Sequence, residues 1–481
     1  MIKKSFYFLF FLIFGLVIFF YHTAITGFDL LPGSAGDASS INYIMEHFWL
    51  WINQIPQHLS FWNMPFYYPS ENTLAYSDVM VGGALFYVPI RFFVRNPFST
   101  LQIWMGVMCI LNYTLFYLLL RRFKYSHLSS AIGSFIFAFG IMRYFKMNHL
   151  QFYMQYPMVL SLLCISYLKS NKHFAIGGFF IFLALEFWTV YTLGYMFCFT
   201  IFVGGFIALL FKSTRRLILD FIKGYYKEIT LYGVLFIISL IPLAKHYLML
   251  GTVRGWAEVF YHFTDFTVWF RNISLLDNTI LKYLPEITKH EETCGGIGLI
   301  TMLFAFFGLW KFEKYRKPIF TTLLFLMLLC VKYGDNSPWL FIYKYIPGAD
   351  GMRVVSRIYF IFLIFYCFGI AEFFKSFNKK LLIFLCVLLL LIEQLPSSNH
   401  TYLWSKKLYY NYTTRVANNL SKSCKVLYYN NYSHDGKIDM LIMWIANFSN
   451  TYSANGCSGV VKEIIWKDNA GYCYVDIDVK K

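Results

Sequence analysis

Apolar runs about as long as a membrane-spanning helix recur along the chain, and short basic stretches separate them. A helix needs about 20 apolar residues to cross roughly 30 Å of hydrocarbon. The runs that approach this length are about 5–22, 99–120, 128–145, 151–168, 229–248, 295–310, 318–332, 354–374 and 380–395. This pattern predicts an all-α bundle that crosses a membrane many times.

The run 174–210 is too long for one span, because a single helix of that length would measure about 55 Å. Polar and small residues interrupt it between Glu186 and Gly194. We therefore predict a turn there between two spanning helices. The bundle would then contain about eleven transmembrane helices.

Residues 79–94 are apolar but short, and they include Gly82, Gly83, Pro89 and Arg91. If this segment does not span, the basic clusters between the other runs all lie on one side, which the positive-inside rule identifies as the cytoplasm. The clusters are Lys3/Lys4, Arg121/Arg122/Lys124, Lys169/Lys172, Lys212/Arg215/Arg216/Lys223/Lys227, Lys311/Lys314/Arg316/Lys317 and Lys375/Lys379/Lys380. We interpret 79–94 as an interfacial helix on the external face, with the N-terminus in the cytoplasm.

This orientation divides the chain into a membrane module and an external tail. Residues 1–395 form the transmembrane module, with external loops at 23–98 and 249–294. The polar tail 396–481 contains the strand-like stretches KVLYY and YCYVDIDV, separated by turn-forming residues. It predicts a small mixed α/β external C-terminal domain.

Composition agrees with a membrane protein and argues against a nucleic-acid-binding one. Apolar residues make up 58% of the chain and charged residues 14%, and the formal charge of +17 lies between the apolar runs, where it reports topology. The ten cysteines form no C-x-x-C pair and no metal-binding cluster with histidine. The tail contains three cysteines: Cys424, Cys457 and Cys473. Two of them could form a disulfide if the tail faces an oxidising compartment.

Asp37, in the first external loop, is the first candidate for chemistry. It precedes SSINYIMEHFWLWI, whose apolar positions predict an amphipathic helix on the membrane surface. Asp37 could cap this helix. It could also accept a proton from a sugar hydroxyl, since apolar surroundings raise the pKa of a carboxylate.

The loop and several other stretches resemble the GT-C superfamily of multi-pass bacterial glycosyltransferases, which use polyprenyl-phosphate-linked sugars. The similar stretches are MPFYYPSENTLAYSDVMVGGALFYVPIRFF, FGIMRYFKMNHLQ, GMRVVSRIYF and NGCSG, and together they extend over nearly the whole chain. The resemblance implies that Asp37 is the base that activates the acceptor and that Asp78 is a second catalytic carboxylate. Asp78 could instead cap the helix that follows it.

Basic residues at the external ends of two predicted spans are candidates for phosphate binding. Arg353 and Arg357 are four residues apart, which places them on one face of a helix, and paired guanidinium groups suit a phosphate. Arg143 and His149 belong to a second external cluster. Both groups could instead anchor helix ends at the interface.

Acidic residues elsewhere are weaker candidates. Glu186 is a substrate-binding candidate, because an ionisable group at membrane depth is costly to insert. Asp265 and the HEET stretch from His290 could bind a divalent cation or form a solvated acidic patch. Glu46 and His47 lie on the polar arc of the surface helix, where we expect them to be solvated.

The leading hypothesis is a glycosyltransferase of the bacterial inner membrane. Its partners would be a polyprenyl-phosphate sugar donor, membrane lipids, and an O-antigen, other glycan, lipid or protein acceptor on the external face. The sequence indicates no definite cofactor, and a divalent cation is a possible one. The alternatives are a transporter or flippase for lipid-linked glycans and a non-catalytic envelope-assembly protein.

Overall fold

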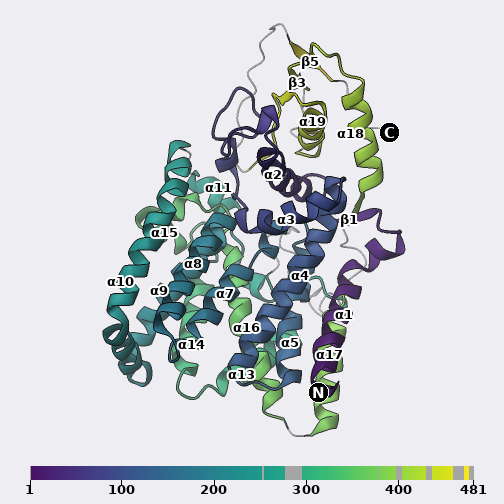
Figure 1. The fold of residues 1–481 in the computed structure, drawn as a ribbon. Coiled ribbons are helices and arrows are strands. Elements are labelled where there is room, and N and C mark those ends of the chain that lie inside the picture. The colour runs from purple at the N-terminus through teal and green to yellow at the C-terminus, as the bar shows by residue number, and fades with distance from the viewer. Residues whose placement is uncertain are drawn as a thin grey trace.

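The computed structural model describes residues 2–251, 254–276, 295–377, 379–396, 403–429, 436–458 and 471–475. It is mostly helical, and a bundle of long helices carries the C-terminal segment, described at 403–429, 436–458 and 471–475, at one end (Figure 1). The bundle helices are α1 (Ile2–Ile25), α4 (Pro97–Arg122), α5 (His127–Phe139), α6 (Ile141–Phe145), α7 (Tyr156–Ile165), α8 (Lys172–Thr189), α9 (Tyr191–Leu210), α10 (Lys212–Met249), α13 (Leu299–Trp310), α14 (Arg316–Leu329), α16 (Tyr359–Lys375) and α17 (Lys380–Glu393).

Shorter elements join and cover these helices. They are the α-helices α2 (Asp37–Ile52), α3 (Val81–Phe93), α11 (Trp256–Tyr261), α15 (Trp339–Tyr345), α18 (Lys406–Asn418) and α19 (Gly436–Ser449). The 3₁₀ turns are η1 (Pro56–His58), η2 (Thr73–Tyr76), η3 (Leu150–Tyr153), η4 (Phe266–Trp269), η6 (Ala349–Gly351) and η7 (Val355–Ile358). The strands are β1 (Leu30–Pro32), β2 (Leu403–Ser405), β3 (Val426–Tyr428), β4 (Tyr452–Ser453) and β5 (Tyr472–Tyr474).

Six helices in the described part of the chain are long and apolar enough to cross a membrane. They are Ser5–Ile25, Pro97–Arg122, His127–Phe145, Tyr191–Leu210, Lys212–Met249 and Val355–Lys375. The other expected spans fall on α7, α8, α13, α14 and α17, which are shorter or less apolar. The structure thus supports a helical membrane protein, with six candidate spans in place of the eleven expected.

The break expected between Glu186 and Gly194 is present. Helix α8 ends at Thr189, Val190 is extended (φ −134°, ψ 91°), and α9 begins at Tyr191. The two helices form an antiparallel pair, which confirms the predicted turn. The N-terminal N–H groups of α9 therefore lack partners within their own helix.

Residues 81–93 form the short helix α3, which lies across the end of the bundle between α2 and α4 (Figure 1). Its 13 residues extend for only about 20 Å, too little to cross the hydrocarbon. A Cβ atom on Gly82 would collide with the side chain of Thr189, so the glycine permits close packing on α8. The length agrees with the predicted interfacial helix.

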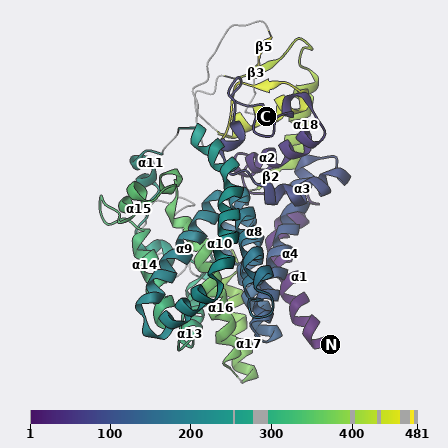
Figure 2. The ribbon, with the colours of Figure 1, turned by 60° about the vertical axis from the view of Figure 1, so that its left-hand side comes forward.

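The C-terminal segment contains a parallel sheet with strand order β4-β3-β5 and a disulfide between Cys424 and Cys473. The two stretches expected to be strands therefore form β3 and β5. The segment packs on the first loop: the Trp444 indole N–H donates to Ser39 Oγ at 2.8 Å, and β2 pairs antiparallel with β1. We call this end of the bundle, with α2, α3 and the C-terminal segment, the capped end (Figure 2).

The opposite end contains the connections 121–127, 166–172, 211–216, 311–317 and 375–380 and is named the basic end. Most of the basic residues that were expected to share one side lie in these connections, whereas Lys3 and Lys4 lie in α1 and Lys223 and Lys227 in α10. Helices α4, α7, α9, α13 and α16 end there, while α5, α8, α10, α14 and α17 begin there.

Candidate functional site

Asp78 lies at the capped end, in the segment between η2 and α3. The Met80 N–H donates to Thr189 O and the Gly82 N–H donates to Thr189 Oγ1, each at 3.0 Å. These bonds fasten the segment to the last turn of α8. Asp78 is thereby held against the break between α8 and α9.

Burial raises the pKa of the Asp78 carboxyl to about 6, against the opposing effects of Arg357 and of the backbone N–H groups of Tyr191 and Thr192. Those two N–H groups belong to the first turn of α9, where the helix dipole favours an anion. Part of the Asp78 side chain stays accessible. A carboxyl that titrates near neutrality can act as a general base.

Glu186 is the second carboxylate of the cluster and lies fully buried in α8. Asp78 and Arg143 both lie within electrostatic range of it. Its two oxygens make no hydrogen bond of ordinary geometry with the described residues, although the backbone of Met158 approaches them. A buried polar group in this situation is costly and points to a functional constraint.

Arg357 and Arg143 flank a pair of aromatic rings. The Arg357 guanidinium lies 4.8 Å from the ring centre of Phe152, and the Phe152 and Phe360 rings are 4.8 Å apart. Arg143 lies 5.8 Å from the Phe360 ring and donates to Phe152 O at 2.8 Å. It also donates to Phe137 O and Gln155 Oε1. Arg143 therefore braces the protein itself, and Arg357 lies against the Phe152 ring.

The expectation that Arg353 and Arg357 share one helical face is wrong. Helix α16 begins only at Tyr359, Arg357 lies in η7, and Val354 is extended (φ −122°, ψ 98°). The β-branched residues Val354 and Val355 disfavour an earlier helix start. Arg353 is half-buried in the irregular segment before η7.

His149 and Lys146 contact the same group of aromatic rings. The His149 ring is 6.0 Å from the Phe152 ring, and the buried Lys146 ammonium is 5.5 Å from the Tyr359 ring. Phe152 therefore contacts both His149 and Arg357. Arg357, Arg143 and His149 from the two predicted phosphate-binding groups thus meet at one aromatic cluster at the capped end.

Asp37 is exposed and is the first residue of α2, whose N-cap is Gly36, so the N-cap interpretation is wrong. Its backbone N–H donates to Ser34 Oγ at 3.0 Å. A Cβ atom on Gly36 would lie 3.5 Å from the Lys437 side chain. The structure therefore leaves Asp37 at the surface beside the C-terminal segment, whereas it encloses Asp78, Glu186, Arg357 and Arg143 together.

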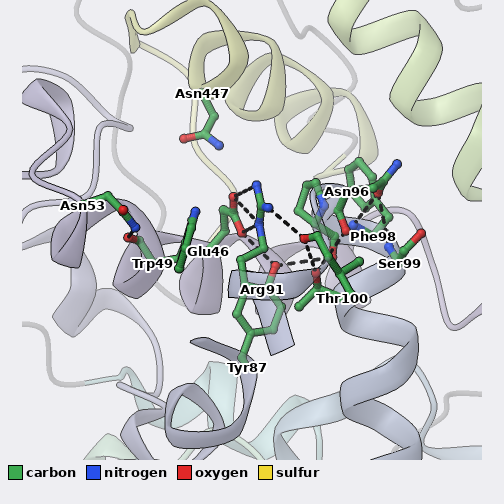
Figure 3. A network of polar contacts seen from close by, with 12 residues as sticks. Glu46, Trp49, Asn53, Tyr87, Arg91, Asn96, Phe98, Ser99, Thr100 and Asn447 are labelled. Atoms are coloured by element: carbon green, nitrogen blue, oxygen red, sulfur yellow. Dashed lines mark hydrogen bonds and ion pairs between the residues drawn. The ribbon is translucent and has the colours of Figure 1, made fainter. Parts of the chain in front are cut away.

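Glu46 is buried, contrary to the expectation that it is solvated. Arg91 of α3 donates to it from Nε and Nη2, each at 2.9 Å, and the Tyr87 hydroxyl donates to Oε2 at 2.9 Å (Figure 3). Burial raises the pKa of the Glu46 carboxyl, and Arg91 opposes the shift. The polar arc of α2 faces α3 instead of water, because α3 folds back over it.

His47 is also buried, and it pairs with His58 of η1. Their Nδ1 atoms are 2.8 Å apart, His47 Nε2 is 3.0 Å from Phe61 O, and His58 Nε2 is 2.9 Å from Asn447 Oδ1. Phe61 O only accepts, so His47 Nε2 carries the proton and donates to it. The chain of bonds connects α2 and η1 to the C-terminal segment.

The structure assigns Asp265 to a helix cap: its Oδ1 accepts from the Thr267 N–H at 2.8 Å. Among the described residues no three metal-ligating side chains gather. His290, Glu291 and Glu292 lie outside the described residues, so the divalent-cation site stays a prediction.

No family model matches the chain, and no curated protein matches it significantly.

Proposed function

We propose that the protein is a membrane glycosyltransferase of GT-C type that acts at the capped end. It would transfer a sugar from a polyprenyl-phosphate donor to a cell-envelope acceptor. The observation that supports this proposal is the placement of the Asp78 carboxyl, whose pKa burial raises to about 6, within electrostatic range of the buried Arg357 guanidinium at one end of an apolar helical bundle. The bundle suits a lipid-linked donor, because the polyprenyl chain would lie along the apolar helices and the donor headgroup would lie at their end.

In this proposal Asp78 is the base and Arg357 binds the leaving group. Asp78 removes the proton from the acceptor hydroxyl, the hydroxyl oxygen attacks C1 of the donor sugar, and the bond between C1 and the phosphate oxygen breaks. The electron pair leaves with the polyprenyl phosphate, whose charge a guanidinium stabilises. Asp37 stays as the alternative base, at the surface where an acceptor would enter.

The other predicted residues support this arrangement. Arg143 holds η3 and α7 in place through its bonds to Phe152 and Gln155. In this proposal His149 and Arg353 would also contact the donor headgroup. Glu186 would accept hydrogen bonds from sugar hydroxyls, which would satisfy its buried oxygens.

A flippase for lipid-linked glycans is the second candidate, because Glu186 is a buried ionisable group beside the broken helix pair α8 and α9. Broken helices with ionisable groups at membrane depth are typical of transporters. The two functions differ in their product: a flippase forms no new glycosidic bond.

The test is transfer of a sugar from a synthetic polyprenyl-phosphate donor by purified protein, together with envelope glycan analysis of a deletion strain. We expect Asp78→Asn to lower transfer at least about 100-fold. The matched control is Asp220→Asn at the basic end, which should transfer normally. Wild-type transfer by Asp78→Asn, with Asp37→Asn inactive, would reassign the base. Glycan translocation without bond formation would favour the flippase.

A further inference from the structure

An apolar cavity of about 630 Å³ occupies the half of the bundle next to the basic end. Helices α4, α7, α9, α10, α14 and α16 contribute to its walls. Lining residues include Leu119, Phe197, Gly205, Leu217, Ile319 and Phe365. The volume falls in the range of about 300–1,000 Å³ typical of ligand sites, and the wall offers almost nothing but hydrocarbon.

The cavity opens to the outer surface of the bundle. Ile201 of α9 and Leu217 of α10 line it and are also 44% and 40% exposed. Exposed apolar side chains on a membrane helix face lipid. An acyl chain can therefore reach the cavity sideways, between α9 and α10.

Basic residues alternate with lining residues at the rim. Lys124 lies between Phe123 and Tyr125, which both line the cavity. Arg215 and Arg216 lie in the same way between Thr214 and Leu217, and Arg316 and Lys317 between Tyr315 and Pro318. The nearby acidic groups are fewer: Glu313, Glu372, which interacts with Tyr125, and Asp220, whose carboxylate is 3.6 Å from Arg216 Nε.

The first part of α10 builds much of this rim. A non-helical residue, Tyr225 (φ −130°, ψ 15°), separates residues 212–224 from the rest of the helix. In that part Leu217 and Ile218 line the cavity, while the Arg216 side chain is 91% exposed. A short helix with an apolar face and basic residues is typical of a membrane surface with anionic lipid.

We propose that this cavity binds one anionic phospholipid, with an acyl chain between α9, α10 and α16 and the phosphate at Arg215, Arg216 and Arg316. The apolar wall requires hydrocarbon, and the excess positive charge at the rim complements a phosphate. The site is separate from the proposed donor site and does not depend on the proposed function.

The donor's polyprenyl chain is the competing occupant, because Ile361 lines the cavity one turn after Arg357. The basic residues argue for the phospholipid. They lie at the end of the cavity away from Arg357, where a polyprenyl phosphate bound at Arg357 would place only its tail.

The experiment measures phosphatidylglycerol retained by purified full-length protein, by native mass spectrometry, after reconstitution in phosphatidylcholine with or without phosphatidylglycerol. Gly205→Phe should fill the cavity, since a Cβ atom at Gly205 meets nothing within 4 Å. We expect it to lower retention about tenfold, as should Arg215→Gln combined with Arg216→Gln.

Matched controls separate the site from general effects. Gly106→Phe places the same ring at another open glycine, on α4, outside the cavity. Lys407→Gln combined with Lys422→Gln removes two exposed charges at the capped end. Both controls should retain the lipid as the wild type does. Equal losses in the controls, equal retention of phosphatidylcholine, or recovery of polyprenyl phosphate in its place would each overturn the proposal.

Discussion

The capped end and the basic end of the bundle hold their charged residues in different ways. At the capped end, Glu46 and Arg143 are 2% and 1% exposed, and protein groups satisfy them. At the basic end, the side chains of the Arg216–Asp220 pair are 91% and 66% exposed. Buried charges fix geometry and shift pKa values, whereas exposed charges report orientation and attract lipid headgroups.

The largest expected effect is at Asp78. Because burial raises the pKa of its carboxyl from 3.8 to about 6, the folded protein holds this proton more tightly than the unfolded chain does. Ionisation of Asp78 therefore lowers the free energy of unfolding. This destabilisation is absent below about pH 4 and reaches its full value, up to about 3 kcal/mol, above about pH 6. Asp78→Asn should therefore raise the melting temperature at pH 7, while it lowers transfer at least about 100-fold through loss of the base.

The same measurements at pH 5 provide the check on Asp78. The stability gain should shrink there, because the wild-type carboxyl is then mostly protonated, and wild-type transfer should fall with the base. A variant that loses activity and stability together would indicate a structural role for Asp78.

The next effect is the loss of the buried ion pair at the capped end. Arg91→Ala leaves the Glu46 carboxylate buried without its cation, which should lower stability by about 3–5 kcal/mol. Arg216→Ala at the basic end should leave the melting temperature unchanged. Thermal melting of both variants in one detergent compares the two ends. If the two variants lost similar amounts of stability, the two ends would not differ in how much their charged residues stabilise the fold.

The disulfide of the C-terminal segment comes third. Cys424 and Cys473 are separated by 49 residues, so opening this loop should cost about 2–4 kcal/mol of local stability. Cys473→Ser should increase protease cleavage of the segment but not of the bundle. Thiol labelling of whole cells with an impermeant reagent adds an orientation test. Cys457 should react without reductant, and Cys424 only after reduction.

The smallest effect is pH-dependent. Burial lowers the pKa of His47 to about 4 and that of His58 well below 6.5. As the pH falls below 6.5, these histidines bind protons more readily in the unfolded chain than in the folded one, which favours unfolding. The contact of His47 and His58 with Asn447 of α19 should therefore weaken between about pH 6.5 and pH 4. Hydrogen exchange in α19 should rise over that range. His58→Gln should reduce the rise, whereas the exposed His173→Gln should not.

The lengths of the apolar runs sufficed to predict the helical bundle and the break at Val190, because both depend on local composition. The short helix α3 also required the distribution of basic residues along the whole chain. The number of spans could not be predicted in the same way. The apolar runs 295–310 and 318–332 gave helices α13 and α14, which are shorter than the hydrocarbon is thick. The strands β3 and β5 were visible as β-branched and aromatic runs. Their parallel pairing was not, because it depends on contacts between distant residues.

The candidate site was only partly accessible to the same reasoning. Asp78, Glu186, Arg143 and Arg357 were each singled out as ionisable groups near helix ends, but nothing local indicated that they meet. The burial of Glu46 depends on Arg91, which lies 45 residues away. The backbone N–H groups of Tyr191 and Thr192 carry no side-chain signal, although the predicted break before them implied a free helix N-terminus.

The pairing of β1 with β2 sets an order on biosynthesis. Leu31 can meet Trp404 only after almost the whole chain has been made. At roughly 5–20 residues per second the ribosome needs on the order of half a minute to a minute to reach that point. During this interval the first loop emerges without its strand partner and without Trp444. We expect nascent chains halted before residue 403 to recruit chaperones or insertases at this loop, and to release them once the tail has docked.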